Sequence, residues 1–158
     1  MTPEIKKFLK FLPDAHAAAI KSKDRSTKVG AVVLDDDYTV LISGYNGFPR
    51  GVNDDVEERH ARPLKYKWTA HSEENCVAQA ARVGARLKGG TMLVTALHPC
   101  TGCSRMIINS GIKRVLAPAT GVPGDSGVDR HDWSDDAKIA MQMLAEANVE
   151  VIYYEVAQ

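Results

Sequence analysis

The chain has 158 residues, 44% of them hydrophobic, and its 20 basic and 20 acidic residues give a net charge of zero. This length and composition predict a single domain, residues 1–158, while the balanced charge argues against a protein that binds long nucleic acids and favours a small substrate. No apolar run approaches the roughly 18 residues that a membrane-spanning helix needs, so we expect a cytoplasmic protein without membrane contact.

The first part of the chain predicts helices followed by a β-hairpin. Apolar residues at near-helical intervals in 3–21 indicate one helix or two, with Pro13 as the break. Short β-branched runs at 29–34 and 39–43, separated by three aspartates, predict two neighbouring strands joined by a turn. A polar stretch rich in turn formers then covers 44–67, which is long enough to carry a function or an interface.

The remainder of the chain alternates helical and strand patterns. It predicts a helix from 69 or 70 to Val83, ended by Gly84, and a second helix from Pro99 to about Ser110, ended by Gly111; a third helix covers 133–147. Strands are predicted at 91–97, 113–117 and 149–154, and a surface loop at 118–131. This order predicts an α/β fold, a three-layer α-β-α sandwich with a mixed five-stranded sheet.

Four residues in the middle of the chain have the composition of a catalytic zinc site. Glu73 follows His71 at the second position, and 26 residues separate it from the Cys-x-x-Cys formed by Cys100 and Cys103. One imidazole and two thiolates give a tetrahedral Zn²⁺ three protein ligands and leave the fourth position for water, whereas a structural site normally closes all four. Glu73 is then available as the catalytic acid and base. We therefore expect one zinc ion per subunit and a hydrolytic reaction.

The predicted helices explain how these residues could meet. Cys100 and Cys103 fall three apart in the first turn of their helix, where the helix dipole favours the thiolates that zinc requires. His71 falls at the start of the preceding helix, and we expect the two helix starts to meet at the carboxyl ends of neighbouring strands. Cys76, in an alanine-rich helical stretch, is expected to be a buried apolar residue rather than a fourth ligand.

The combined zinc motif and a basic segment before the first strand both indicate the kind of reaction and substrate. Alone, a Cys-x-x-Cys also occurs in structural zinc knobs and redox sites, but H-x-E followed by P-C-x-x-C is the pattern of the zinc nucleobase deaminases. Ser22, Lys23 and Arg25 form a partly basic segment before the first strand, where a 5′-phosphate would need positive charge. A solvated surface run explains that segment equally well.

The chain resembles the deoxycytidylate (dCMP) deaminases of bacterial and phage type, in the cytidine/deoxycytidylate deaminase superfamily. The motifs that carry the resemblance occur in the family's order at 23–31, 44–51, 65–66, 71–75, 99–103 and 107–112. The resemblance implies the cytidine deaminase-like fold and the hydrolysis of dCMP to dUMP and ammonia, which supplies pyrimidine deoxynucleotides for dTMP synthesis.

The resemblance also implies roles for single residues. Asn46 stands at the position that meets the sugar and the base, and Ala70, Ser72 and His98 are further candidates for substrate binding. Ser72 replaces the family's usual alanine. His98 stands where relatives often carry an apolar or acidic residue, and either it faces the substrate or, as the more ordinary explanation, it is a satisfied structural histidine. The stretch containing Gly44, Tyr45, Gly47 and Phe48 resembles the segment with which many relatives bind a nucleoside triphosphate effector, a ligand that Mg²⁺ would accompany.

Several alternatives stay open on the sequence. Ser72, His98 and the polar loop at 121–131 depart from the family pattern, and they would suit a different amino-bearing substrate such as a 5-substituted dCMP, a purine monophosphate or a tRNA base. A non-catalytic zinc-binding module would instead have four protein ligands, with Cys76 or His98 among them. We expect a homo-oligomer, from dimer to hexamer, because the long 44–67 loop and the apolar pair at 107–108 favour self-association.

Overall fold

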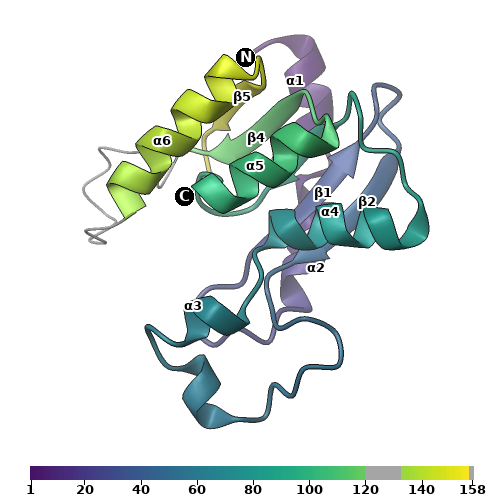
Figure 1. The fold of residues 1–158 in the computed structure, drawn as a ribbon. Helices are drawn as coiled ribbons and strands as arrows, with labels where there is room; N and C mark the ends of the chain where they lie inside the picture. Colours follow the sequence, from purple (N-terminus) through teal and green to yellow (C-terminus); the bar gives the residue numbers. More distant parts are fainter. Residues whose placement is uncertain (120–132, 157–158) are drawn as a thin grey trace.

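The computed structural model describes residues 1–119 and 133–156, and it contains a mixed β-sheet with helices on both faces (Figure 1). The strands are β1 (Gly30–Leu34), β2 (Val40–Tyr45), β3 (Thr91–Val94), β4 (Arg114–Pro118) and β5 (Glu150–Tyr154). They lie in the order β2-β1-β3-β4-β5, in which β1 is antiparallel to β2 and β3 whereas β3, β4 and β5 are parallel. The predicted mixed five-stranded sheet is confirmed.

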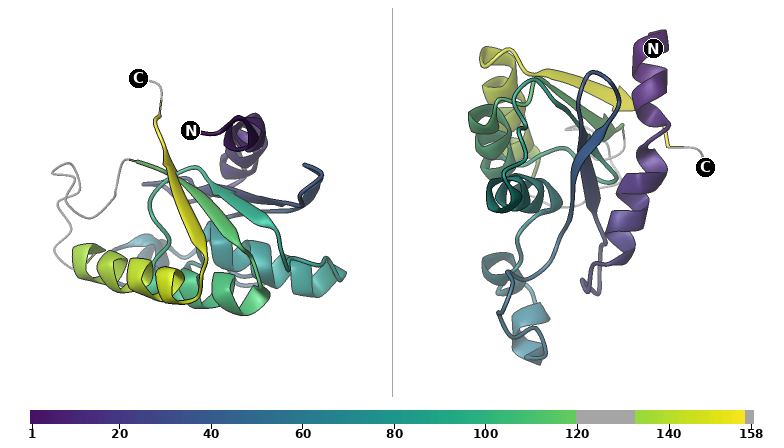
Figure 2. Two further views of the ribbon diagram at one scale, coloured as in Figure 1. Left: turned by 90° about the horizontal axis from the view of Figure 1, so that it is seen from above. Right: turned by 90° about the vertical axis from the view of Figure 1, so that its right-hand side faces the viewer.

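The helices form the two outer layers, as Figure 2 shows. One face of the sheet carries α1 (Pro3–Leu9) and α2 (Leu12–Ile20); the other carries α4 (Ser72–Val83), α5 (Thr101–Ser110) and α6 (Trp133–Glu146). Alternate residues of β3 point to opposite faces, so that Met92 and Val94 join the larger core under α4, α5 and α6 while Leu93 joins the smaller core under α1 and α2. The three-layer arrangement follows from this alternation.

The boundaries of the site-bearing helices differ from the prediction by one to three residues. The helix α4 begins at Ser72 and α5 at Thr101, because His71 and Cys100 are extended N-cap residues rather than members of the first turn. The strand β3 ends at Val94 instead of position 97. Both helices end at left-handed glycines, as predicted.

The stretch between β2 and α4 was expected to be an irregular polar loop, but it contains two short helical elements. They are the 3₁₀ helix η1 (Glu57–His60) and α3 (Lys65–Trp68), and together they project beyond one end of the sheet (Figure 1). Aromatic contacts hold this projection together: the guanidinium of Arg59 lies 4.0 Å from the centre of the Trp68 ring, and His60 packs edge-on against Phe48 at 5.0 Å.

The strands that precede α4 and α5 are not arranged as predicted. The helix starts of α4 and α5 meet, but their preceding strands β2 and β3 are not neighbours as expected, because β1 lies between them. The predicted loop at 118–131 falls, after its first two residues, outside the described part of the chain. Within residues 1–119 and 133–156, no helix has the length and apolarity that crossing a membrane requires.

Candidate zinc and active site

The N-terminal ends of α4 and α5 bring the three predicted zinc ligands together. Nδ1 of His71 lies 3.3 Å from Sγ of Cys103 and 3.4 Å from Sγ of Cys100. Bonds of about 2.0 Å to nitrogen and 2.3 Å to sulfur around one tetrahedral ion would separate these atoms by about 3.5 Å, so the donor set fits Zn²⁺. Among the described residues, neither Cys76 nor His98 belongs to this group. Within the described part of the chain, the candidate metal-binding group thus consists of three residues.

Hydrogen bonds at the two helix starts fix the ligands. The backbone N–H of His71 donates to Oε2 of Glu74 at 2.8 Å, which ties the α4 N-cap to its own first turn. Sγ of Cys100 accepts a bond of 3.4 Å from the first turn of α5. Asp136, on α6, accepts from both the N–H and the hydroxyl of Thr101 at 2.9 and 2.7 Å. All three helices of this face thus position the site.

The three candidate ligands shift one another's pKa values. Hydrogen bonding from Cys103 and then from His71 outweighs burial and lowers the pKa of Cys100 to about 4. The same contact with Cys100 raises the pKa of His71 to about 9. The pKa of Cys103 is raised, because it shares a proton with Cys100 and is buried. Cys100 therefore carries the negative charge, and a divalent metal ion bound here would displace the protons of His71 and Cys103.

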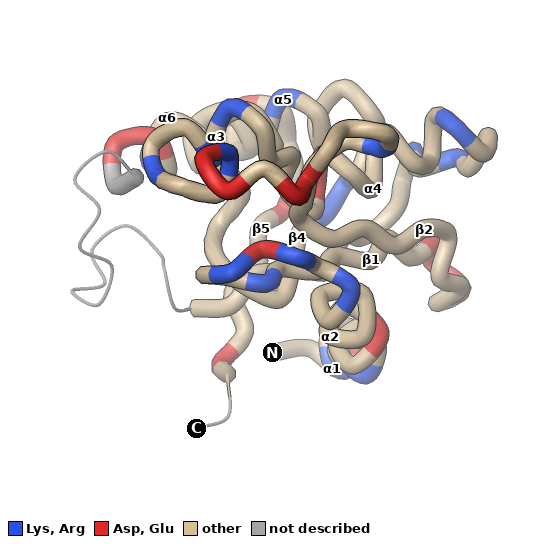
Figure 3. Tube along the Cα trace, turned by 90° about the horizontal axis from the view of Figure 1, so that it is seen from below, with Lys and Arg blue, Asp and Glu red and all other residues tan. Residues whose placement is uncertain are grey.

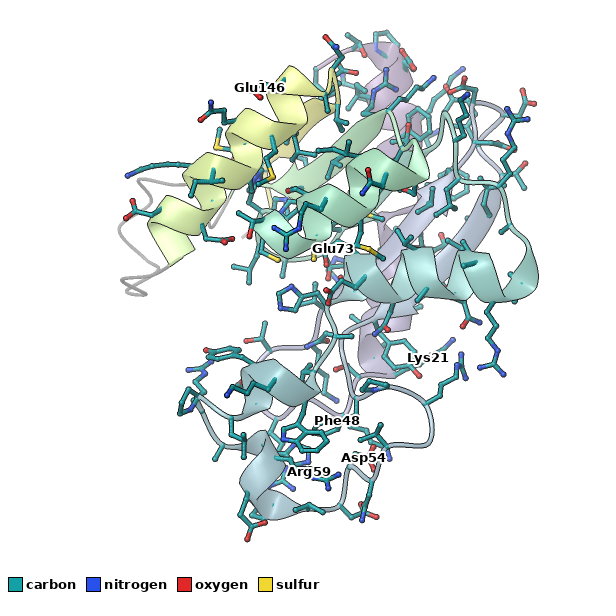
Figure 4. All side chains as sticks on the ribbon, viewed as in Figure 1. Lys21, Phe48, Asp54, Arg59, Glu73 and Glu146 are labelled. Atoms are coloured by element: carbon teal, nitrogen blue, oxygen red, sulfur yellow. The ribbon has the colours of Figure 1, made fainter. Side chains whose placement is uncertain are left out.

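Glu73 lies beside the ligands, between the starts of α4 and α5 (Figure 4). Its side chain is buried, with 5% of the residue exposed, and Oε2 accepts a hydrogen bond of 2.8 Å from the hydroxyl of Ser72. Burial raises the pKa of Glu73 above that of an exposed glutamate. A raised pKa makes the carboxyl group a stronger base, and proton uptake and release is what a general acid and base must perform.

A pocket of about 70 Å³ opens beside the ligands, and three of the seven predicted substrate residues, Asn46, Ser72 and His98, line it. His71 and Glu73 line it as well. Ala70 does not line the pocket, since its backbone N–H and C=O are paired with Gly47 at 2.9 and 3.0 Å. The amide of Asn46 also has a structural part, because it accepts from the N–H of Val29 at 2.8 Å.

None of the three phosphate candidates lines this pocket. Ser22 is buried, and its hydroxyl donates to the backbone carbonyl of Asn46 at 2.7 Å. Lys23 pairs with Asp54 at 2.7 Å, and Arg25 pairs with Glu57. The two cations line an adjoining pocket of about 130 Å³ instead.

The sequence reasoning missed the cations that do line the zinc-side pocket. Arg62 and Lys65 reach it from the projection, together with Tyr66. Lys65 lines both pockets and forms an ion pair of 2.7 Å with the buried carboxylate of Asp24. Lys65 and Tyr66 belong to a motif, 65–66, that carries the family resemblance and could have indicated a role in the site. Arg62 belongs to none of the motifs that carry the resemblance.

The four effector candidates belong to a separate cleft. Gly44, Tyr45, Gly47 and Phe48 line a space of about 480 Å³ between the edge strand β2 and α4. Three cations also line this cleft, namely Lys21, Arg50 and Arg82. The cleft is thus basic.

Comparisons with known proteins agree with this geometry. A "Probable deoxycytidylate deaminase" of Caenorhabditis elegans is 36% identical over 115 residues, 71% of this chain, although the match spans only 57% of the nematode protein. The human "Deoxycytidylate deaminase" is 31% identical over 144 residues, which are 88% of this chain and 74% of the human protein.

The fold matches that of a solved enzyme along nearly its whole length. The dCMP deaminase of cyanophage S-TIM5, determined in complex with dCMP and dUMP, superposes with a TM-score of 0.70 at 25% identity and covers 98% of this chain and 99% of the phage chain. Residues 5–118 match the family described as the cytidine and deoxycytidylate deaminase zinc-binding region. The chain therefore belongs to the cytidine and deoxycytidylate deaminase family.

Proposed function

We propose that the protein is a zinc-dependent hydrolase that converts dCMP to dUMP with release of ammonia and so supplies pyrimidine deoxynucleotides. The observation that carries this proposal is a buried carboxyl group, Glu73, beside a set of three metal ligands that leaves one coordination position open. The nematode and human relatives support dCMP as the substrate by the activity in their names, and the phage enzyme does so by its bound nucleotides.

The residues of this chain divide the reaction between them. Zinc, held by His71, Cys100 and Cys103, would supply a Lewis acid that makes water nucleophilic near neutral pH. Glu73 takes a proton from the attacking water and passes it to the ring nitrogen of cytosine. It then takes the second proton of that water and delivers it to the amino group, which departs as ammonia as the carbonyl forms. The Ser72 hydroxyl holds Oε2 of Glu73, which leaves the other carboxylate oxygen available for these transfers.

We propose that the nucleotide's 5′-phosphate faces Arg62 and Lys65. Both line the zinc-side pocket, and Arg62 makes no ion pair with another described residue. Lys23 and Arg25 would extend the positive charge through the adjoining pocket. Arg62→Gln should raise the KM for dCMP about tenfold and leave turnover of deoxycytidine, which lacks the phosphate, unchanged; Arg86→Gln, on the exposed segment after α4, is the matched control.

A free nucleotide suits the surface better than a polynucleotide. Figure 3 shows Lys and Arg interspersed with Asp and Glu over the face seen from below, instead of gathered in one basic stripe. A protein that binds tRNA through its phosphates would need such a stripe. Salt-sensitive binding of tRNA to the purified protein would contradict this part of the proposal.

The Glu73→Gln variant tests the assigned chemistry. The substitution keeps the size and the hydrogen-bonding capacity of the side chain, so the protein should retain one zinc per subunit while ammonia release from dCMP falls at least about a hundredfold. Glu146→Gln, which neutralises an exposed carboxylate of α6, is the control and should keep full activity. A Glu73→Gln enzyme as active as the wild type would refute the role.

We propose, in addition, that the basic cleft beside β2 binds a nucleoside triphosphate effector with Mg²⁺ in a homo-oligomer of this cytoplasmic enzyme. Lys21, Arg50 and Arg82 supply the charge that phosphates require. Ammonia release should respond to dCTP or dTTP in the presence of Mg²⁺, and Arg82→Gln should weaken that response with little change in basal activity. Sedimentation with and without the triphosphate would give the oligomeric state.

A further inference from the structure

His98 has one ring nitrogen engaged and one free. The residue is 4% exposed and lines the zinc-side pocket, and its Nδ1 lies 3.0 Å from the hydroxyl of Tyr153. Its Nε2 is buried and has no hydrogen-bond partner among the described residues. A buried polar atom is normally satisfied, and leaving it unpaired costs free energy. The pocket is where a partner for this atom can arrive.

The Tyr153 contact indicates which nitrogen carries the proton. Of the two groups, the phenol is the stronger acid and the imidazole nitrogen the stronger base, so we assign the Tyr153 O–H as the donor to Nδ1. A neutral imidazole that accepts at Nδ1 carries its proton on Nε2. The unpartnered atom is thus an N–H donor, and it needs an acceptor.

We propose that the Nε2–H of His98 donates a hydrogen bond to an acceptor atom on the base of the bound nucleotide, and that Tyr153 is a positioning residue that fixes the tautomer of His98. The inference rests on the proposed function, since it takes the zinc-side pocket as the nucleotide site. Tyr153 lies on β5, outside the residues 5–118 that match the family. The C-terminal strand therefore takes part in building the site.

The tautomer can be tested without any activity. In protein labelled with ¹⁵N-histidine, the His98 signals should show the Nε2–H form in the wild type. In Tyr153→Phe they should show a mixture of the two tautomers, because the phenyl ring cannot donate to Nδ1. An Nδ1–H form in the wild type, or an unchanged spectrum in Tyr153→Phe, overturns the assignment.

Binding of dUMP tests the contact itself, because this product is not consumed. His98→Phe should retain zinc and weaken dUMP binding about tenfold by calorimetry, the size expected for one lost hydrogen bond in a pocket. His98→Gln, which keeps an N–H donor, should lose less affinity. Thr91→Val is the matched control, since the hydroxyl of Thr91 is also buried without a partner among the described residues but does not line the pocket.

The outcomes separate this inference from the proposed function. Affinity for dUMP that is unchanged in both His98 variants overturns the contact, even if the wild type deaminates dCMP normally. A wild-type enzyme that binds dUMP through His98 but releases no ammonia from dCMP overturns the proposed reaction and leaves the contact in place. Should His98→Phe fail to fold, His98→Gln and the Tyr153→Phe spectrum still decide the inference.

Discussion

Gly44 has a packing reason for being glycine that is independent of any effector. A Cβ atom at this position would lie 2.6 Å from the carbonyl oxygen of Ser72 and 2.7 Å from the backbone nitrogen of Cys76. Both atoms belong to the backbone of α4, which cannot yield as a flexible side chain would. Glycine thus allows β2 to approach the helix that begins at the zinc ligand His71.

Substitution of two glycines in the same motif separates packing from effector binding. Gly44→Ala should lower the free energy of unfolding by about 1–3 kcal/mol, because α4 must move away from β2. Gly47→Ala is the control, since a Cβ there meets no atom within 4 Å. Urea denaturation of the zinc-loaded proteins measures both. Equal stability of the two variants would contradict the packing argument.

At the scale of elements, ion pairs attach the η1–α3 projection to the segment that follows α2. The inner pair joins Lys65 to Asp24, whose side chains are only 13% and 5% exposed. The outer pair, Lys23 with Asp54, has a lysine that is 72% exposed. Burial makes the inner pair the important one, because exposed ion pairs contribute about 0–1 kcal/mol. Asp24 and Lys65 also line the zinc-side pocket, so their ion pair fixes part of the pocket wall.

The Asp24 carboxylate should make stability depend on pH in the acid range. Burial opposes its ionisation, but hydrogen bonds from Lys65, Thr27 and Ser26 outweigh burial and lower the pKa of Asp24 from 3.8 to about 2. Ionised Asp24 therefore favours the folded state above pH 3.8, and its contribution, about 1–2 kcal/mol after allowance for solvent screening, is lost as the pH falls toward 2.

Two variants measure this contribution. Asp24→Asn should be less stable than the wild type at pH 5, and the difference should shrink as the pH falls toward 2. Lys23→Gln, which removes the exposed outer pair, should change stability by less than about 1 kcal/mol at either pH. Guanidinium denaturation at several pH values gives the comparison. A constant difference between Asp24→Asn and the wild type would show that Asp24 does not titrate as argued.

Features encoded by residues close together in the sequence could be predicted, whereas contacts between residues far apart in the sequence could not. The juxtaposition of His71 with Cys100 and Cys103 was predictable, because each of the two short motifs stands at a helix start. Arg62 and Lys65 were not predicted for the pocket, because they reach it only when the projection folds back: the Lys65–Asp24 hydrogen bond spans 41 residues. The predicted helix starts lie two or three residues too early, because the sequence pattern did not distinguish the N-cap residues His71 and Cys100 from residues of the first helical turn.

At the scale of the whole molecule, the candidate zinc ligands come from elements that are not neighbours in the sheet. His71 caps the start of α4, which follows the edge strand β2, whereas Cys100 and Cys103 lie at the start of α5, which follows β3. Strand β1 separates β2 from β3. A shared ion would therefore connect the two halves of the larger core, and its binding free energy would add to the stability of the folded state.

Removal of zinc should lower the melting temperature by roughly 5–10 °C, as expected for loss of a tightly bound ligand from a domain of this size, and added Zn²⁺ should restore it. Cys76→Ala should melt lower through lost packing, because Cys76 is fully buried, yet keep the same shift on chelation. Cys100→Ser should lose most of the shift, because it lacks a ligand thiolate. Scanning calorimetry with metal analysis tests this: a wild-type protein stripped of zinc that melts at an unchanged temperature would show that the ion does not connect the two helices.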